Sequence, residues 1–211
     1  MTDVWSERAE AYRRSEAHRE GPDLDLIVEW AEGAKAAVDV ATGGGHVARR
    51  LREAGLEVTT VDPAEGMEPD VVASAEQLPF ADVSVELVVS RLGAHHFSDV
   101  RAAMREMARV AARAVIVVDN TFGGEALEQA ERIRDSSHVR CYTVEEWREL
   151  FVDAGLGIDD VRFLPHRIEF EPWLVRAGCA GEDAERVREL IADRIEDGWI
   201  TLDRMALKGV K

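Results

Sequence analysis

Residues 38–48 read VDVATGGGHVA, and the rest of the chain is interpreted outward from this stretch. The mostly apolar residues 36–41 predict a buried strand, the glycines at 43–45 predict a tight turn, and residues 47–54 have the apolar spacing of a helix. Glycines let a backbone approach a ligand closely, and the first amides of a helix carry partial positive charge. The stretch therefore predicts a ligand-binding strand, turn and helix.

A second strand at residues 58–61 ends in Asp62, whose carboxylate is well placed to accept hydrogen bonds from two ribose hydroxyls. The spacing of Gly43, Gly45 and Ala48, with an acid nineteen residues after Gly43, also satisfies the dinucleotide fingerprint. These residues indicate an adenosine-containing cofactor and leave S-adenosylmethionine and a nicotinamide dinucleotide both open. A tight turn with no ligand is the remaining interpretation.

Composition narrows the class of protein. A chain of 211 residues with 46% apolar content predicts a single domain over residues 1–211. There is no apolar run of about eighteen residues and no basic-then-apolar N-terminus, so we expect a cytoplasmic protein without membrane insertion. The two cysteines form no CxxC pair and predict no metal site. The net charge of -16 argues against a nucleic-acid partner.

Two predicted helices, at residues 3–18 and 24–31, form an N-terminal helical cap (1–34) before the first strand. Dinucleotide-binding folds usually begin near their first strand, so this prefix favours the methyl donor. Only about seven residues separate Asp62 from the next predicted strand at 70–73, whereas a parallel crossover normally contains a helix. We therefore expect that helix to be cut to a turn.

The remaining pattern alternates strands with helices up to residue 120, which predicts a parallel sheet covered by helices on both faces. We expect strands at 83–89, 114–118, 156–170 and 204–210, and helices at 98–111, 125–135, 144–154, 171–177 and 183–195, residues 171–195 being a helical insertion. Ligands of such sheets lie outside the carboxyl ends of the strands. The site should therefore use the loops at 42–46, 62–68, 74–80, 90–97 and 119–123.

Several motifs in this order resemble the class I S-adenosylmethionine-dependent methyltransferases, especially the small-molecule branch with the ubiquinone and menaquinone biosynthesis C-methyltransferases. They are DVATGGGH at 39–46, AEQLPF at 75–80, Ser90-Arg91 and HHF at 95–97. The resemblance spans residues 5–165. It implies an α/β fold with a Rossmann-like, doubly wound, mostly parallel seven-stranded sheet and an antiparallel C-terminal strand. It also implies methyl transfer from S-adenosyl-L-methionine to a small-molecule acceptor, by a monomer or homodimer.

The resemblance implies roles for individual residues. Asp39 would orient the turn, Asp62 would take the ribose hydroxyls, Ala75 and Glu76 would border the adenine, and the remaining cofactor contacts would come from Ala41, Thr42, Gly43, Gly45, Pro63, Met67, Ser90 and Arg91. Two features depart from the family pattern. Ser74 stands where many relatives have an aspartate, and the helix after Asp62 is missing. We expect weaker cofactor binding, or adenine held by Met67, Leu78 and backbone groups.

Methyl transfer from a sulfonium is an in-line displacement, so the protein chiefly supplies alignment and desolvation. A base is needed only if the acceptor must lose a proton, and His95, His96 and His138 are the catalytic candidates. The first two histidines would otherwise be packing or capping residues. His138 lies in the segment 136–142, which with Arg140 and Tyr142 either overhangs the site or is a solvated connector.

Tyr12 on the N-terminal helix either covers the cofactor as part of a lid or packs at the surface, while Trp147 and Phe151 are assigned to the core. Two other functions stay open at this point. One is a nicotinamide-dependent reductase, and the other is a non-catalytic protein that binds S-adenosylmethionine.

Overall fold

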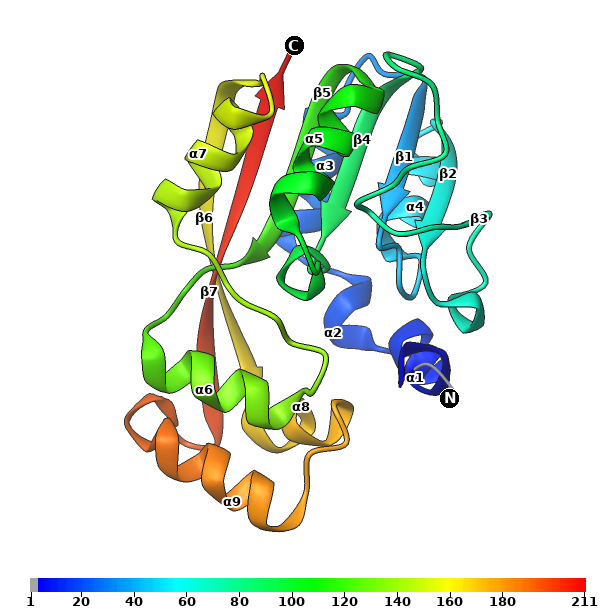
Figure 1. Cartoon of the computed structure of the whole chain (residues 1–211). Helices are drawn as coiled ribbons and strands as arrows, with labels where there is room; N and C mark the ends of the chain where they lie inside the picture. The colour runs from blue at the N-terminus through cyan, green and yellow to red at the C-terminus, as the bar shows by residue number, and fades with distance from the viewer. Residues whose placement is uncertain (1–3) are drawn as a thin grey trace.

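The computed structural model describes residues 4–211, except the side chains of Val4, Glu7, Glu16 and Ala17. Its centre is one seven-stranded sheet with the order β3-β2-β1-β4-β5-β7-β6 (Figure 1). The strands are β1 Ala36–Val40, β2 Glu57–Asp62, β3 Val71–Val72, β4 Val85–Arg91, β5 Ala111–Asn120, β6 Gly157–Glu169 and β7 Trp199–Val210. The first five pair in parallel, whereas β7 runs antiparallel between β5 and β6. The predicted mostly parallel sheet with an antiparallel last strand is confirmed.

The β6–β7 pair is longer than the sequence pattern predicts. The closing strand was expected at 204–210, but β7 begins at Trp199, and its register with β6 runs from Glu169 paired with Trp199 to Gly157 paired with Val210. Cross-strand pairing with β6 extends the strand through residues whose own pattern resembles a loop. The pair therefore projects beyond the parallel strands and carries its own helices (Figure 1).

Helices cover both faces of the parallel strands. They are α3 Pro22–Trp30, α4 His46–Glu53, α5 Val100–Val110 and α7 Val144–Asp153. Helices α3 and α4 pack one face, where Leu24, Ile27 and Leu51 are fully buried, and α5 and α7 pack the other (Figure 1). Trp147 and Phe151 on α7 are fully buried, as predicted. This two-faced burial is the doubly wound arrangement that the alternating pattern predicts.

A separate apolar cluster forms around the projecting ends of β6 and β7. It involves α6 Glu125–Arg134, α8 Phe170–Arg176 and α9 Gly181–Leu190, with Phe170, Trp173 and Val187 buried. The helix predicted at 183–195 ends at Leu190, and a 3-10 turn, η3 Ala192–Arg194, follows. Because this helical unit stands beyond the carboxyl ends of the parallel strands, it faces the edge where ligands bind (Figure 1).

The N-terminal segment folds as α1 Val4–Arg13 and α2 Glu16–Arg19 instead of one helix over 3–18, and residue 3 lies outside the described residues. Between β2 and β3 only a 3-10 turn, η1 Glu65–Met67, replaces a crossover helix, as predicted. Ala9 of α1 is buried in a small cluster with Ala64 and Met67 of this turn. The shortened connection thus provides the surface on which α1 packs.

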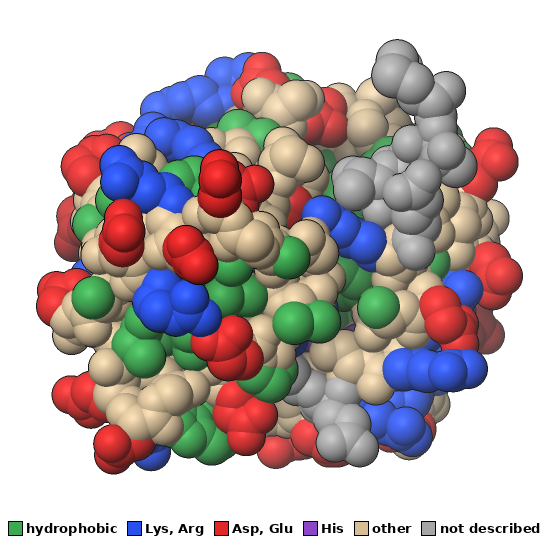
Figure 2. Space-filling view, turned by 90° about the horizontal axis from the view of Figure 1, so that it is seen from below, with side chains coloured by type: hydrophobic (Ala, Val, Ile, Leu, Met, Phe, Trp, Pro, Cys, Tyr) green, Lys and Arg blue, Asp and Glu red, His purple; other side chains and the backbone are tan. Residues whose placement is uncertain are grey.

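No helix in the described part of the chain is long and apolar enough to cross a membrane. The surface seen from below the sheet, around the helical unit and α1, shows acidic and basic side chains interspersed among small apolar areas (Figure 2).

Candidate active site

One cavity of about 350 Å³ opens at the carboxyl edge of the sheet. Each of the five loops predicted for the site contributes to its wall, which contains Thr42, Gly43, Gly44, His46, Asp62, Pro63, Met67, Ser74, Ala75, Glu76, residues 91–93, residues 95–98 and Asn120. The opposite wall comes from α1, α6, α8, β6 and β7. A cavity of this size, enclosed by several elements, is typical of a small-molecule site.

The glycine turn after β1 has the left-handed backbone that its sequence requires. Gly43 and Gly45 have φ of +51° and +73°, and Ala41 has φ of +56° although it carries a Cβ. A Cβ built at Gly43 meets no atom within 4 Å, so open space lies beside the turn. Gly45 itself is not part of the cavity wall, whereas Ala41, Thr42 and Gly43 are. The turn therefore offers exposed backbone on its cavity side.

Asp39 holds this turn from beneath. Its Oδ2 atom accepts hydrogen bonds from Thr42 Oγ1 (2.6 Å) and from the Ala48 amide (3.1 Å). The side chain is buried, and burial raises the pKa of Asp39 to about 6 despite these donors. Asp39 thus joins the turn to the start of α4, and its role toward the cofactor stays a prediction from the resemblance.

Asp62 closes the turn from the neighbouring strand. Its Oδ2 accepts from the Gly43 amide (3.0 Å) and its Oδ1 from the Ala64 amide (3.0 Å). The residue is 6% exposed and lines the cavity with Pro63 and Met67. The carboxylate is thus directed at the glycine turn, beside the open space at Gly43.

The loop after β3 forms the adjacent wall. Ser74, Ala75 and Glu76 line the cavity. The Oε1 atom of Glu76 accepts from the Ser98 amide and hydroxyl, both at 2.9 Å. Burial alone would raise the pKa of Glu76, but these donors outweigh it and lower that pKa. Glu76 therefore anchors the loop to the start of α5 in addition to bordering the cavity.

The two residues that end β4 have different surroundings. Ser90 is fully buried and is not part of the cavity wall, and its hydroxyl has no hydrogen-bond partner among the described residues. Arg91 does line the cavity. Its Nε donates to Asp23 Oδ2 (2.7 Å) and one NH group donates to the His18 carbonyl (2.9 Å). The Arg91 side chain therefore ties β4 to the N-terminal cap.

Two of the three predicted catalytic histidines line the cavity. His95 contacts Asp119 Oδ1 through Nδ1 (2.5 Å), and its own amide donates to Asp119 Oδ2 (2.9 Å). Burial lowers the pKa of His95, but the Asp119 carboxylate outweighs burial and raises it above the usual value. The Asp119 carboxylate therefore favours the protonated form of His95.

His96 is the neutral member of the pair. Its Nδ1 lies 3.0 Å from the Ser137 carbonyl, which can only accept, so Nδ1 carries the proton and Nε2 is left as an acceptor. Burial, with the charge of His95, lowers the pKa of His96 to about 3. The ring packs edge-on against Trp5 of α1, with ring centroids 4.6 Å apart. His96 can accept a hydrogen bond in the cavity, but it is a weak base.

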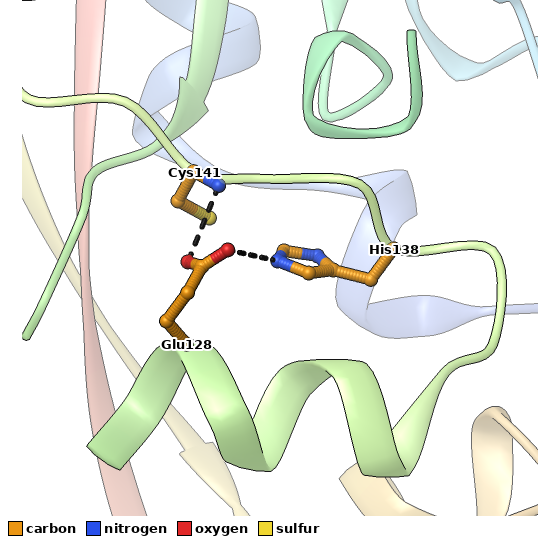
Figure 3. A group of neighbouring side chains, drawn as sticks. All are labelled: Glu128, His138 and Cys141. Atoms are coloured by element: carbon orange, nitrogen blue, oxygen red, sulfur yellow. Dashed lines mark hydrogen bonds and ion pairs between the residues drawn. The ribbon is translucent and has the colours of Figure 1, made fainter. Parts of the chain in front are cut away.

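His138 does not reach the cavity, which corrects its assignment as a catalytic candidate. Its side chain is 1% exposed, and Nε2 contacts Glu128 Oε1 at 3.0 Å. Figure 3 shows Glu128 between His138 and Cys141, whose amide donates to Glu128 Oε2 at 3.3 Å. The nitrogen, oxygen and sulfur atoms that these three buried side chains direct at one another lie within 4.8 Å. His138 is directed toward α6 because the buried Glu128 carboxylate attracts it.

The rest of the segment 136–142 also lies behind the site. The amides of Val139 and Arg140 donate to the His95 carbonyl at 3.0 and 3.1 Å. Arg140 pairs with Glu146, and neither Arg140 nor Tyr142 lines the cavity. The hypothesis that this segment carries side-chain contacts to an acceptor is therefore wrong, and it supports η2 (Ala94–His96) from outside.

Helix α1 covers the cavity on the other side. Trp5 and Tyr12 line it, and His46 Nε2 donates to the Tyr12 carbonyl at 2.9 Å. A Cβ on Gly44 would lie 2.7 Å from that carbonyl, and one on Gly66 would lie 2.6 Å from the Ser6 Cα. Helix α1 therefore rests directly on two glycines, and the role of Tyr12 as part of a lid stays a prediction.

Several lining residues lie outside the motifs that the sequence analysis identified. They are Arg134 on α6, His166 and Ile168 on β6, Trp173 and Arg176 on α8, and Leu202 and Arg204 on β7. No spacing in the sequence identifies these side chains, because they come from four elements. They meet because the β6–β7 pair projects beyond the parallel strands and carries α6 and α8 to the carboxyl edge of the sheet (Figure 1).

Comparison with known proteins gives a consistent result. Residues 38–118 match the family model described as a methyltransferase domain. The chain is 32% identical to the uncharacterized methyltransferase YcgJ of Bacillus subtilis, over 89% of this chain and 82% of that protein. It is also 37% identical to the ubiquinone/menaquinone biosynthesis C-methyltransferase UbiE of Rubrivivax gelatinosus, over 35% of this chain and 34% of that protein.

Solved structures agree with these relatives. The crystal structure of B. subtilis YcgJ superimposes with a TM-score of 0.80 at 25% identity, covering 90% of this chain and 97% of that one. A putative methyltransferase from Bacillus halodurans superimposes with a TM-score of 0.79 at 25% identity, over 90% of this chain and 99% of the other.

Proposed function

Because the chain belongs to the S-adenosylmethionine-dependent methyltransferases, we propose that it transfers a methyl group to a small-molecule acceptor bound in this cavity. One observation carries the proposal. The glycine turn and Asp62 share one cavity with a second wall to which α1, α6 and α8 contribute. Donor and acceptor can therefore lie side by side, away from water. The interpretation as a nicotinamide-dependent reductase is rejected by the family assignment.

The residues present fit the cofactor. The open space at Gly43 admits a ligand against the backbone, and Asp62 lies beside it with its carboxylate already oriented by two amides. We assign ribose binding to Asp62 and the adenine wall to Met67, Ala75 and Glu76. The methionine end would lie against the turn and the backbone after β4, with contacts from Ala41, Thr42, Gly43, Pro63 and Arg91. Gly45 and Ser90 act behind this surface by holding its shape, and Asp39, which lines the cavity, holds the turn through Thr42 and Ala48.

S-adenosylmethionine, when bound, supplies an activated methyl group on a sulfonium. The protein then has to align the acceptor and exclude water, effects that reach roughly 7 to 11 kcal/mol in well-oriented systems. Helix α1 excludes water by covering the cavity through Trp5 and Tyr12. His96 Nε2 is suited to accept a hydrogen bond from an acceptor hydroxyl or amine, and the His95–Asp119 pair holds η2 in place.

An acceptor of low molecular weight is supported by the enclosure and by charge. A chain with net charge -16 repels polyanions such as nucleic acids, and the surface in Figure 2 mixes both signs of charge. The cavity of about 350 Å³ must also hold part of the cofactor, which leaves room for a compact acceptor. We expect the protein to act in the cytoplasm.

Calorimetric titration with S-adenosylmethionine and S-adenosylhomocysteine tests the proposal, with reduced nicotinamide dinucleotide as the control ligand. We expect both adenosyl ligands to bind and the dinucleotide not to bind. Transfer of a radiolabelled methyl group to a metabolite extract then separates an enzyme from a non-catalytic binding protein. If the wild type binds both adenosyl ligands but transfers no more methyl group than Asp62→Ala does, only the non-catalytic function remains.

A further inference from the structure

Part of the cavity wall is basic. Four arginines line it, and we call them the arginine cluster: Arg91, Arg134, Arg176 and Arg204. The acidic side chains of the cavity wall are Asp39, Asp62 and Glu76, which belong to the turn, the end of β2 and the loop after β3. The carboxylates thus lie on the cofactor side, Arg91 at the end of β4 also belongs to that side, and the other three guanidinium groups come from α6, α8 and β7.

Nearby carboxylates neutralise only part of the arginine cluster. Arg91 and Arg204 share one oxygen of Asp23, with nitrogen–oxygen distances of 2.7 and 3.4 Å. Arg134 pairs with Glu131 at 2.9 Å and lies over the Trp173 ring, 4.4 Å from its centroid. Two guanidinium groups facing one carboxylate leave an excess of positive charge in a poorly solvated place.

Arg176 is the cation without an acidic partner. It ends α8, is partly exposed, and makes no hydrogen bond or ion pair with any residue that the structure describes. Burial and the neighbouring Arg134 lower its pKa, as expected for a guanidinium that faces other cations. One NH₂ group of Arg91 is also buried without a hydrogen-bond partner among the described residues. Both residues belong to the cavity wall, but only Arg176 is partly exposed, so its guanidinium is the donor that remains available there.

The excess positive charge also acts on nearby titratable groups. Burial, followed by Arg204, lowers the pKa of His166 to about 4, and burial with Arg176 and Arg91 lowers the pKa of His18. Both histidines line the cavity and are neutral at pH 7. Clustered positive charge costs free energy in the protein without a ligand, and a bound anion would offset that cost.

Apolar side chains lie next to the arginine cluster. Ile168, Trp173 and Leu202 line the same wall, and each is less than 10% exposed. The outer surface around this unit has interspersed charges (Figure 2), so the concentration of arginines is a property of the cavity. A ligand that matches this wall has an apolar body and an anionic group.

We propose that the methyl acceptor is an organic anion whose carboxylate or phosphate is bound by Arg176, with Arg204, while its apolar body packs on Trp173 and Leu202. A planar guanidinium binds either anion through paired hydrogen bonds. This assignment rests on the proposed function, because it gives the acceptor side of the same cavity its substrate class. The rival occupant of Arg176 is the carboxylate of the cofactor itself.

The test uses the full-length protein and three probes of similar shape, benzoate, phenyl phosphate and benzamide, each titrated by calorimetry with and without S-adenosylhomocysteine. We expect at least one anion to bind about tenfold or more tightly than benzamide. Comparison of benzoate with phenyl phosphate then distinguishes a carboxylate from a phosphate as the preferred group. Equal binding of benzamide, or binding of none of the three, overturns the proposal.

Variants assign the effect to Arg176. Arg176→Gln should weaken the bound anion about tenfold, Arg176→Lys should restore part of that loss, and the affinity for S-adenosylhomocysteine should stay within about twofold. The matched control is Arg186→Gln, since Arg186 on α9 is exposed, pairs with Glu189 and lies outside the cavity wall. An unchanged anion affinity in Arg176→Gln contradicts the proposal.

Two further outcomes separate the proposals. Loss of S-adenosylhomocysteine binding in Arg176→Gln, with anion binding retained, assigns Arg176 to the cofactor and overturns this inference. A wild type that binds the anion but not S-adenosylhomocysteine overturns the proposed function and leaves the anion site standing.

Discussion

The carboxylate of Asp62 accepts a hydrogen bond of 3.0 Å from the backbone amide of Gly43. This bond joins the end of β2 to the turn after β1, two points nineteen residues apart in sequence. The turn and the predicted ribose-binding acid are therefore structurally coupled, and a substitution at either residue should change the position of the other.

Replacement of Asp62 tests this assembly. Asp62→Asn loses one charged acceptor, either for Gly43 or for Ala64, and weakens the acceptor for ribose hydroxyls. We expect the affinity for S-adenosylhomocysteine to fall by about tenfold or more, since hydrogen bonds to charged groups contribute about 1.5 to 3 kcal/mol. Calorimetry gives the affinity, and Asp159→Asn, at an exposed residue on β6, is the control. Unchanged affinity would exclude Asp62 from the cofactor site.

The seat of α1 on the glycine turn predicts a second effect. Gly44→Ala places a methyl group 2.7 Å from the Tyr12 carbonyl, and Gly66→Ala places one 2.6 Å from Ser6. Both should displace α1 and open the cavity, so ligand affinity falls while the core is retained. Gly157→Ala is the matched control, because its Cβ would meet nothing closer than 3.7 Å. Limited proteolysis near α1 measures the displacement, and equal cleavage in all three variants would contradict it.

Asp23 is the shared carboxylate partner of two buried guanidinium groups, so its loss should lower stability strongly. Asp23→Asn leaves Arg91 and Arg204 without their shared carboxylate, and we expect the free energy of unfolding to fall by about 3 to 5 kcal/mol. Urea denaturation measures it. The control is Glu53→Gln, which breaks a surface ion pair with Arg49 and should cost no more than about 1 kcal/mol. Similar losses in the two variants would be evidence against the buried pair.

His166 predicts a dependence of stability on pH. Its pKa in the folded protein is about 4, below the 6.5 of an unperturbed histidine, because burial and Arg204 disfavour the charged form. The unfolded chain therefore binds more protons between pH 6.5 and 4, and the contribution of His166 to stability is present above pH 6.5 and lost as the pH falls.

We expect His166→Gln to lose less stability than the wild type between pH 7 and about 4.5. Urea denaturation at several pH values measures the difference, and the other buried histidines act equally in both proteins. Parallel curves for wild type and variant would show that His166 keeps an ordinary pKa.

Most of the fold follows from local features of the sequence. Apolar runs with the periodicity of strands and helices predict the parallel strands, and the short connection after Asp62 predicts the missing crossover helix. The residues on the glycine-turn side of the cavity could also be identified from the sequence. The glycine turn, Asp39 and Asp62 lie at strand ends, and parallel strands bring their ends to one edge whatever the rest of the chain does.

The acceptor side was decided by the tertiary structure. The sequence suggests His138 as a catalytic residue, but its hydrogen bond to the buried Glu128 holds it outside the cavity. No sequence pattern distinguishes Arg134, Arg176 and Arg204 from the other arginines. Their meeting depends on where the long β6–β7 pair projects and how α6 and α8 pack on it. Periodicity is a property of neighbouring residues, whereas charge complementarity across a cavity belongs to residues that only packing brings together.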